Sequence, residues 1–396
     1  MMEDQPFPRP RAGSLAPTSA EERIPALDII RGFALLGVLL AYTLWNLGNA
    51  PDDRYSRMDR LLDTVLTALI DTKFYTTFAF LFGVGFAIQL TRARARGASI
   101  VLTYYRRLLA LLAIGLAHAL LLRNGDILVP YAVMGFVLLL FRNASTATLA
   151  IGAAMGLLFP YVARGAWELA GLPFPQRPEG VYASYLVENL AWVRYWYSTG
   201  LFFWPGSLPM FLLGLSLGAN RFFEHLPSHE RAIRRALAGG LLAGVLAYAG
   251  RAWLASHWPG APGSFEQRLV LGLLWTAHAW GLAAFYMSSL LLLTRNPAWL
   301  RRLAPVGAVG RMALTNYLLQ AAIVVPVCVA FDLFNRITPA LGLLLALLVW
   351  SVEVPVSSWW LARFRFGPAE WLWRSLTYGR AQPMRIEQRG VAATGA

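Results

Sequence analysis

The chain has 396 residues, of which 57% are hydrophobic and 14% are charged. Soluble domains usually contain about 25% charged residues, so this composition excludes an ordinary soluble protein and indicates a membrane protein. The net charge of +14 comes from arginines between apolar segments, which favours an anionic membrane surface over nucleic acid as the partner. A single cysteine, Cys328, excludes an intramolecular disulfide, and because no metal-binding motif is present we expect no metal site.

The chain contains ten apolar segments that approach the roughly 20 residues of a membrane-spanning helix. They lie near residues 26–45, 70–90, 106–122, 127–141, 145–163, 199–218, 237–254, 270–293, 312–331 and 339–361. We therefore predict an all-α polytopic bundle of about ten transmembrane helices. One membrane domain covers residues 23–380, and the polar ends, 1–22 and 381–396, are predicted to be flexible cytoplasmic tails.

Arginine counts predict the orientation, because cytoplasmic loops carry the excess of basic residues. With the N-terminus inside, the cytoplasmic segments hold 23 arginines and the outer segments hold 10. This bias predicts a multi-pass protein of the cell inner (plasma) membrane with both termini in the cytoplasm.

The first apolar segment begins with a pair of opposite charges, Asp28 and Arg31. The two residues are three apart, so they share one face of the helix. Ionised residues beside a membrane span are costly and are candidates for a functional site. The alternative is that the pair only neutralises itself and fixes the end of the helix.

The third segment carries charged and titratable residues at both ends. Arg106 and Arg107 begin it, and His118 follows Arg106 by twelve residues, about 18 Å along a helix. Histidine exchanges a proton near neutral pH, so His118 is a candidate general base. Asp126 follows a glycine turn and is predicted to fold back towards His118. The alternative for His118 is a histidine that only packs one helix against another.

Within the outer segment 164–198, the aromatic stretch from Tyr182 to Tyr197 is predicted to form a helix at the outer interface, because Trp and Tyr suit that depth. An aromatic belt and an acceptor-binding rim both fit this stretch. Glycine pairs at 214 and 218 and at 240 and 244 permit close helix contacts within one chain or in a homodimer.

Four polar side chains are predicted to be buried in the later spans. Asn316 and Gln320 lie one turn apart, and their usual role is hydrogen bonding between helices. Glu353 needs a partner in lipid, and His278 is a further candidate polar site residue.

Four motifs together resemble the YeiB-like membrane proteins, also called the domain of unknown function 418 (DUF418). The resemblance covers about residues 23–380, with the C-terminal family region at about 220–380. The motifs are Leu27-Asp28-Ile29-Ile30-Arg31-Gly32-Phe33, Lys73-Phe74-Tyr75 with Phe78 to Phe86, His118 with Gly125-Asp126-Ile127-Leu128 and Tyr131, and the blocks Gly310 to Gln320 and Phe366 to Arg374.

The first helix of that family is similar to that of heparan-α-glucosaminide N-acetyltransferase, which carries a like D-x-x-R-G. The resemblance implies transfer of an acyl group from cytoplasmic acyl-CoA to an acceptor across the membrane. One departure stands out. The related helices usually place Asn fourteen residues after the Asp, where this chain has Tyr42, with Asn46 one turn later.

The leading hypothesis is an acyl-CoA-dependent transmembrane acyltransferase that acts on an unidentified hydroxyl or amine. Five arginines would bind the CoA phosphates: Arg92, Arg94, Arg96, Arg106 and Arg107. His118 would act as general base with Asp126 behind it, while Asp28 and Arg31 would organise the cytoplasmic mouth. The alternatives are a transporter or flippase for a small metabolite or lipid, and a non-catalytic membrane scaffold.

Overall fold

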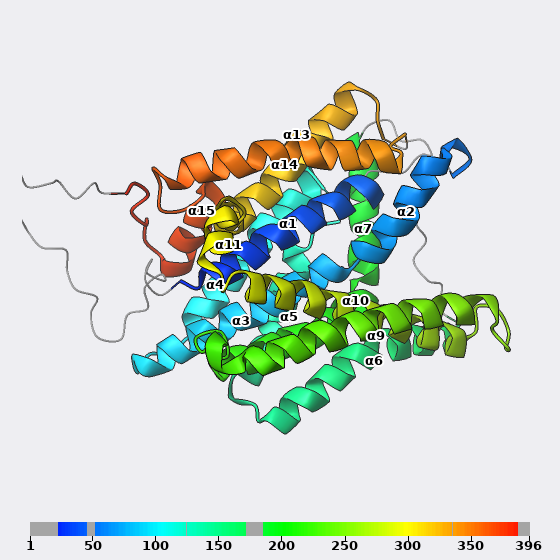
Figure 1. The fold of residues 1–396 in the computed structure, drawn as a ribbon, viewed down its shortest axis with the longest axis horizontal. Coiled ribbons are helices and arrows are strands. Elements are labelled where there is room, and N and C mark those ends of the chain that lie inside the picture. Colours follow the sequence, from blue (N-terminus) through cyan, green and yellow to red (C-terminus); the bar gives the residue numbers. More distant parts are fainter. Residues whose placement is uncertain (1–22, 46–51, 124, 172–184, 335, 387–396) are drawn as a thin grey trace, which may run out of the picture.

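A computed structural model describes residues 23–45, 52–123, 125–171, 185–334 and 336–386. The described chain is helical (Figure 1), and an isolated antiparallel β-bridge joins Phe364 and Arg385. The α-helices are α1 (Pro25–Trp45), α2 (Arg57–Leu69), α3 (Lys73–Ala95), α4 (Val101–Leu121), α5 (Leu128–Leu140), α6 (Thr146–Leu169), α7 (Tyr185–Phe203), α8 (Leu208–Ala219), α9 (Glu230–Ser256), α10 (Phe265–Leu293), α11 (Pro297–Arg302), α12 (Ala304–Arg311), α13 (Ala313–Ala330), α14 (Pro339–Leu361) and α15 (Pro368–Tyr378).

The predicted all-α polytopic bundle is confirmed. Eight described helical segments are long and apolar enough to cross a membrane, and a ninth is counted if the bent pair α7–α8 is one span. Each of the ten predicted segments contains a helix, but two differ from the expected form. The segment at 127–141 forms helix α5 of only 13 residues, and the segment at 199–218 contains a break between residues 200 and 204, where the helices Tyr185–Gly200 and Trp204–Ala219 bend by 70°.

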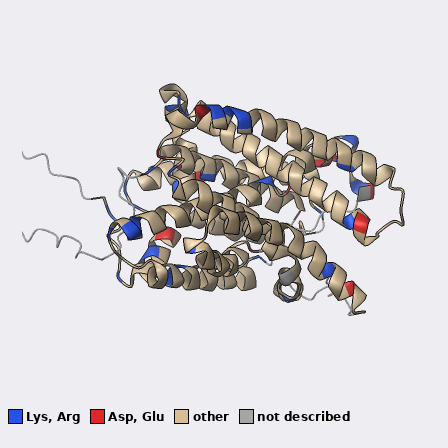
Figure 2. Cartoon of the chain, turned by 90° about the horizontal axis from the view of Figure 1, so that it is seen from below, with Lys and Arg blue, Asp and Glu red and all other residues tan. Residues whose placement is uncertain are grey.

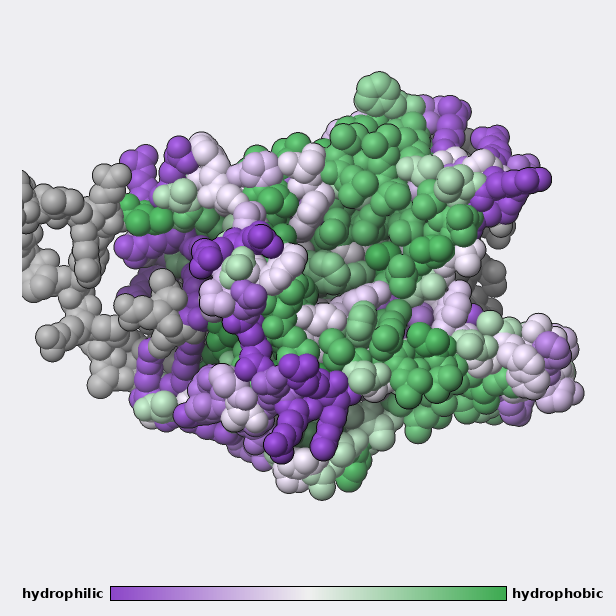
Figure 3. Space-filling view, in the orientation of Figure 1, coloured by the Kyte–Doolittle hydropathy of each residue, from purple (hydrophilic) through white to green (hydrophobic). Residues whose placement is uncertain are grey.

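The surface of the bundle suits a lipid environment. Figure 3 shows hydrophobic residues across the middle of the visible face and hydrophilic residues towards both ends. Figure 2 shows the middle of the bundle mostly free of charged residues. Large apolar side chains point outwards, among them Leu242 and Leu246 of α9, each 61% exposed. Both ends of the described chain lie on the same side of the bundle (Figure 1), which is the arrangement that an even number of spans requires.

Two helices occupy stretches that were expected outside the membrane. Residues 57–69, which lie between the first two predicted spans, form α2, which begins with a capping box between Ser56 and Asp59. Asp59 also accepts the amide of Ala340 at 3.1 Å, which ties α2 to the start of α14. Helix α7 lies in the predicted aromatic stretch, and Figure 1 draws it across the direction of α9 and α14.

Both predicted glycine pairs serve contacts within this chain. A Cβ at Gly214 or Gly218 would meet the backbone or a side chain of α3, and one at Gly240 or Gly244 would meet α10. The backbones of α8 and α9 approach their neighbours closely at these points because glycine lacks a side chain.

Helix α15 is fastened to the start of α13 by a buried carboxylate. Glu370 is 8% exposed and accepts the amides of Leu314 at 2.6 Å and Thr315 at 3.1 Å, and the Thr315 hydroxyl at 2.5 Å. These amides belong to the first turn of α13, where backbone N–H groups have no partner inside the helix.

The structure describes the chain as far as Ile386, six residues past the predicted boundary at residue 380. Residues 381–386, expected as part of the tail, pair with the residues that follow α14: the amide of Arg365 donates to the carbonyl of Met384, and that of Ile386 to the carbonyl of Arg363. Trp371 of α15 donates to the carbonyl of Gln382 at 2.7 Å. The remainder of the predicted C-terminal tail and the N-terminal tail, 1–22, lie outside the described residues.

Replacing Glu370 by alanine is expected to destabilise the protein by at least about 3 kcal/mol, because it leaves three buried donors unsatisfied at a cost of roughly 1–3 kcal/mol each. The measurement is thermal unfolding of the purified protein in detergent. Glu224→Ala is the matched control, since this exposed carboxylate satisfies no buried backbone donor, and its effect should stay within about 0.5 kcal/mol. Equal losses in both variants would contradict the role given to Glu370.

Candidate functional site

A cavity of about 750 Å³ opens at the end of the bundle that holds both ends of the described chain. That volume is typical of sites for small molecules and cofactors. Its walls come mainly from α1, α3, α4, α15 and the start of α13. Eight arginines and three carboxylates line it. We call the arginines the arginine mouth: Arg23, Arg31, Arg92, Arg96, Arg107, Arg311, Arg365 and Arg374.

The eight arginines of the arginine mouth outnumber the three carboxylates that line the same cavity, so the lining carries a net positive charge. Arg31 forms a 2.6 Å ion pair with Asp28, and both residues line the cavity. Burial lowers the pKa of Arg374 below its ordinary value, and the charges of Arg23 and Arg31 lower it further. Arginine nevertheless stays protonated at neutral pH. A cluster of like charges in a partly enclosed site attracts anions, so the mouth is suited to phosphate or carboxylate groups.

One face of α4 connects the mouth to the deep part of the bundle. Tyr104, Arg107 and Leu111 line the cavity at helical spacing, and His118 continues the same face. Eleven residues make about three whole turns, so Arg107 and His118 point the same way. Arg106 is offset by a third of a turn, is exposed and does not line the cavity. Of the predicted arginine pair on α4, therefore, only Arg107 faces the cavity.

The same geometry divides the arginines of α3. Gln89, Arg92 and Arg96 share the face that lines the cavity. Arg94 points elsewhere: its guanidinium donates to the carbonyl of Arg142 at 2.7 Å and to the Asn143 side chain at 2.8 Å. The structure thus places three of the five predicted arginines at the cavity and two outside it.

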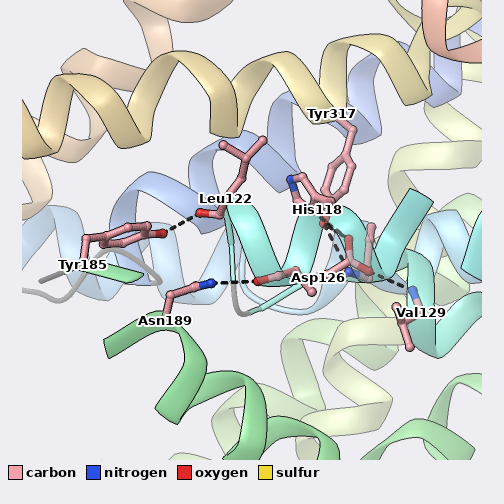
Figure 4. A network of polar contacts seen from close by, with 9 residues as sticks. His118, Leu122, Asp126, Val129, Tyr185, Asn189 and Tyr317 are labelled. Atoms are coloured by element: carbon pink, nitrogen blue, oxygen red, sulfur yellow. Dashed lines mark hydrogen bonds and ion pairs between the residues drawn. The ribbon is translucent and has the colours of Figure 1, made fainter. Parts of the chain in front are cut away.

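Beyond the far end of the cavity lies a histidine–aspartate pair (Figure 4). His118 Nδ1 is 2.9 Å from Asp126 Oδ1, and both side chains are buried. Asp126 also accepts the amide of Val129 at 2.8 Å and the hydroxyl of Tyr317 at 3.2 Å. The fold-back of Asp126 onto His118 that the glycine turn predicts is therefore present.

The carboxylate sets the chemistry of the imidazole. A ring nitrogen facing a carboxylate carries the proton, so Nδ1 donates to Asp126 and the lone pair lies on Nε2. His118 Nε2 has no hydrogen-bond partner among the described residues. His118 is therefore arranged as a general base: the Asp126 carboxylate orients the ring, and Nε2 is available to accept a proton.

A tyrosine separates the cavity from this pair. Ile127, Leu128 and Tyr317 line the cavity, whereas His118 does not. The rings of Tyr317 and His118 are 5.0 Å apart, and the Tyr317 hydroxyl accepts the amide of Ile127 at 3.1 Å. The cavity thus stops one side chain short of the imidazole.

The other predicted polar residues lie apart from the cavity lining. His278 contacts the carbonyls of Gly244 and Ala68, each at 2.9 Å, and so joins α10 to α9 and α2. Asn316 donates to Ser357 at 2.9 Å, which links α13 to α14. Gln320 donates to Glu353 at 3.0 Å, and this is the partner that Glu353 needs in lipid. Tyr42 is 1% exposed and packs near Arg123, and Asn46 lies outside the described residues.

Several cavity residues were not predicted as site residues. Tyr317 and Arg374 lie in family motifs, but nothing in their local sequence shows which residues face them across the bundle. Arg374 is three residues after Trp371 on a short amphipathic helix, a pattern that equally fits a solvated surface helix. Trp373 covers Arg107, with the guanidinium carbon 3.8 Å from the ring centroid.

Comparisons with known proteins place the chain among uncharacterized relatives. The family model described as "Protein of unknown function (DUF418)" matches residues 217–380. The chain is 34% identical to "Uncharacterized protein YxaH" of Bacillus subtilis, covering 94% of this chain and 98% of that protein. It is 32% identical to an "Uncharacterized 39.9 kDa protein in amylase 3'region" of Bacillus acidopullulyticus (94% and 99%) and 28% identical to "Uncharacterized protein YeiB" of Escherichia coli (91% and 98%).

Proposed function

The chain belongs to the YeiB-like DUF418 family of multi-pass membrane proteins, and from this premise we propose that it is an integral-membrane acyltransferase. It moves an acyl group from cytoplasmic acyl-CoA to a hydroxyl or amine acceptor at or beyond the membrane. The single observation that carries the proposal is that the cavity has an anion-attracting mouth at one end and, one side chain beyond its other end, an oriented base.

The lining of the cavity matches the parts of an acyl-CoA molecule. Arginines bind phosphates by paired hydrogen bonds, so the arginine mouth suits the CoA phosphates. Between the mouth and Tyr317 the wall is largely apolar, with Leu35, Phe78 and Phe82 among its residues. This wall suits the pantetheine arm and the acyl chain, with the thioester near Tyr317.

The transfer step needs one proton acceptor. His118 Nε2 takes the proton of the acceptor hydroxyl or amine as its oxygen or nitrogen attacks the thioester carbon. The bond between that carbon and sulfur breaks, and the proton passes to the CoA thiolate, so the products are the acylated acceptor and free CoA. Asp126 holds Nδ1–H and stabilises the imidazolium that forms between the two events.

The test is binding of acetyl-CoA and a long-chain acyl-CoA to the purified full-length protein in detergent. We expect saturable 1:1 binding and weaker binding of dephospho-CoA, which lacks the 3′-phosphate that the arginines would hold. No binding of either acyl-CoA would overturn the proposal. Solute counterflow in liposomes without CoA would then favour the transporter, and a stable partner without either activity would favour the scaffold.

A further inference from the structure

A buried cation lies beyond the outer end of α4, and it has no carboxylate partner in the described part of the chain. Arg123 is 4% exposed and takes part in none of the ion pairs formed there. A buried charge without a counter-ion is strongly unfavourable, so a ligand that brings the opposite charge to Arg123 would be bound favourably.

One edge of the Arg123 guanidinium has no hydrogen-bond partner in the described chain. The guanidinium carbon of Arg123 lies 4.0 Å from the ring centroid of Tyr42. The Nε and Nη2 atoms are buried without any hydrogen-bond partner in the described chain. These two nitrogens form one edge of the guanidinium, and their N–H bonds point the same way. That edge matches the two oxygens of a carboxylate or phosphate.

Two further polar atoms without a described partner come from the residues around Arg123. They are the Tyr42 hydroxyl, on a side chain that is 1% exposed, and the Nε2 atom of His118. The amide of Arg123 donates to the carbonyl of His118 at 2.9 Å, and the Tyr317 ring lies 6.0 Å from the guanidinium and 5.0 Å from the imidazole. A cation, a hydroxyl and a base are thus gathered in one buried cluster.

Helix α7 encloses this cluster from the outer side. The Tyr185 hydroxyl donates to the carbonyl of Leu122 at 2.5 Å, and the Asn189 amide donates to Ala119 at 2.8 Å and to Leu120 at 3.1 Å (Figure 4). These bonds hold α7 over the end of α4, where the helix would otherwise expose unpaired carbonyls.

We propose that Arg123 and the Tyr42 hydroxyl form an oxyanion subsite for the acceptor. The acceptor is then an acidic compound: its carboxylate or phosphate lies on the Nε–Nη2 edge of Arg123, and its hydroxyl or amine faces Nε2 of His118. This inference rests on the proposed acyl transfer, because it assigns the chemical class of the second substrate. It also gives Tyr42 a function at the position where the related helices usually carry Asn.

The test is thermal unfolding of the purified full-length protein with succinate, inorganic phosphate or neutral succinamide at constant ionic strength. We expect succinate or phosphate, but not succinamide, to raise the unfolding temperature, and the better of the two identifies the anionic group. The arginine mouth also attracts anions, so the relevant quantity is the part of the stabilisation that Arg123→Gln removes. We expect affinity for the oxyanion at this subsite to fall at least tenfold in that variant.

Three further variants complete the test. Arg194→Gln, at an exposed arginine of α7, should bind as the wild type does. Tyr42→Phe keeps the ring over Arg123 and should weaken binding about two- to tenfold. If Arg123→Gln fails to fold, Arg123→Lys, which keeps the charge and loses the paired edge, takes its place with the same expected direction.

The inference is overturned if neither oxyanion stabilises the wild type, or if the Arg123 and Tyr42 variants bind as the wild type does. Acetyl-CoA binding in the same samples separates this result from failure of the proposed function. Loss of the oxyanion effect with intact acetyl-CoA binding removes only the subsite. Absence of acetyl-CoA binding with an intact oxyanion effect would rule out acyl-CoA as the donor and would still support the oxyanion subsite.

Discussion

Replacing His118 by alanine will lower acyl transfer by a factor of roughly 10²–10⁴, the usual contribution of a general base. The loss should appear in the rate of transfer and not in acyl-CoA binding, because His118 lies beyond Tyr317 and does not line the cavity. The measurement is release of CoA thiol by the purified protein with a competent acceptor, alongside the dissociation constant for acetyl-CoA.

His225→Ala is the control, since this histidine is exposed in the loop that follows α8. Asp126→Asn should also slow transfer, because the amide no longer stabilises an imidazolium on His118. Full activity of His118→Ala, with unfolding temperature unchanged, would remove His118 from the mechanism.

The second prediction compares acyl-CoA binding by variants of two adjacent arginines of α4. Arg107→Gln is expected to weaken acyl-CoA binding about 10–100-fold, because a hydrogen bond to a charged group is worth about 1.5–3 kcal/mol. Arg106→Gln, one residue earlier on the same helix, should change binding less than about twofold, since its side chain is exposed and outside the cavity. Isothermal titration with acetyl-CoA measures both.

A second pair of variants, on α3, controls for loss of folding, because Arg107 also packs on Trp373 of α15 and its replacement could disturb that contact. Arg92→Gln should weaken binding and Arg94→Gln should not, since only Arg92 lines the cavity. Equal effects within both pairs would mean that the arginines act through bulk charge. The assignment of the arginine mouth as the phosphate site would then fail.

Local pattern was enough to predict some of the site. The glycine turn after α4 predicted that Asp126 folds back on His118, since only a few residues separate them. The spacing of Asn316 and Gln320 likewise predicted polar contacts between helices. The division of the arginines could also have been predicted, because 100° per residue puts Arg107 and Arg92 on the faces of His118 and Gln89.

Other parts of the site depend on contacts between residues far apart in the chain. Tyr317 reaches Asp126 across 191 positions, and Glu370 reaches Leu314 across 56. Arg123 has the sequence context of an ordinary loop arginine, and only tertiary packing, with the Tyr42 and Tyr317 rings beside it, makes it a buried cation. Periodicity carries no information about such partners.

The sequence by itself determined that the chain is a helical membrane protein, where its long apolar helices lie and which positions carry polar groups. Those properties follow from hydrophobicity and helical period, which act over a few turns. Tertiary structure alone decided that α3, α4 and α15 bring their arginines to one cavity, which tyrosine closes it and which cation has no carboxylate partner in the described chain. The physical reason is that burial and ion pairing depend on what neighbouring helices bring into contact, and a linear pattern does not specify those neighbours.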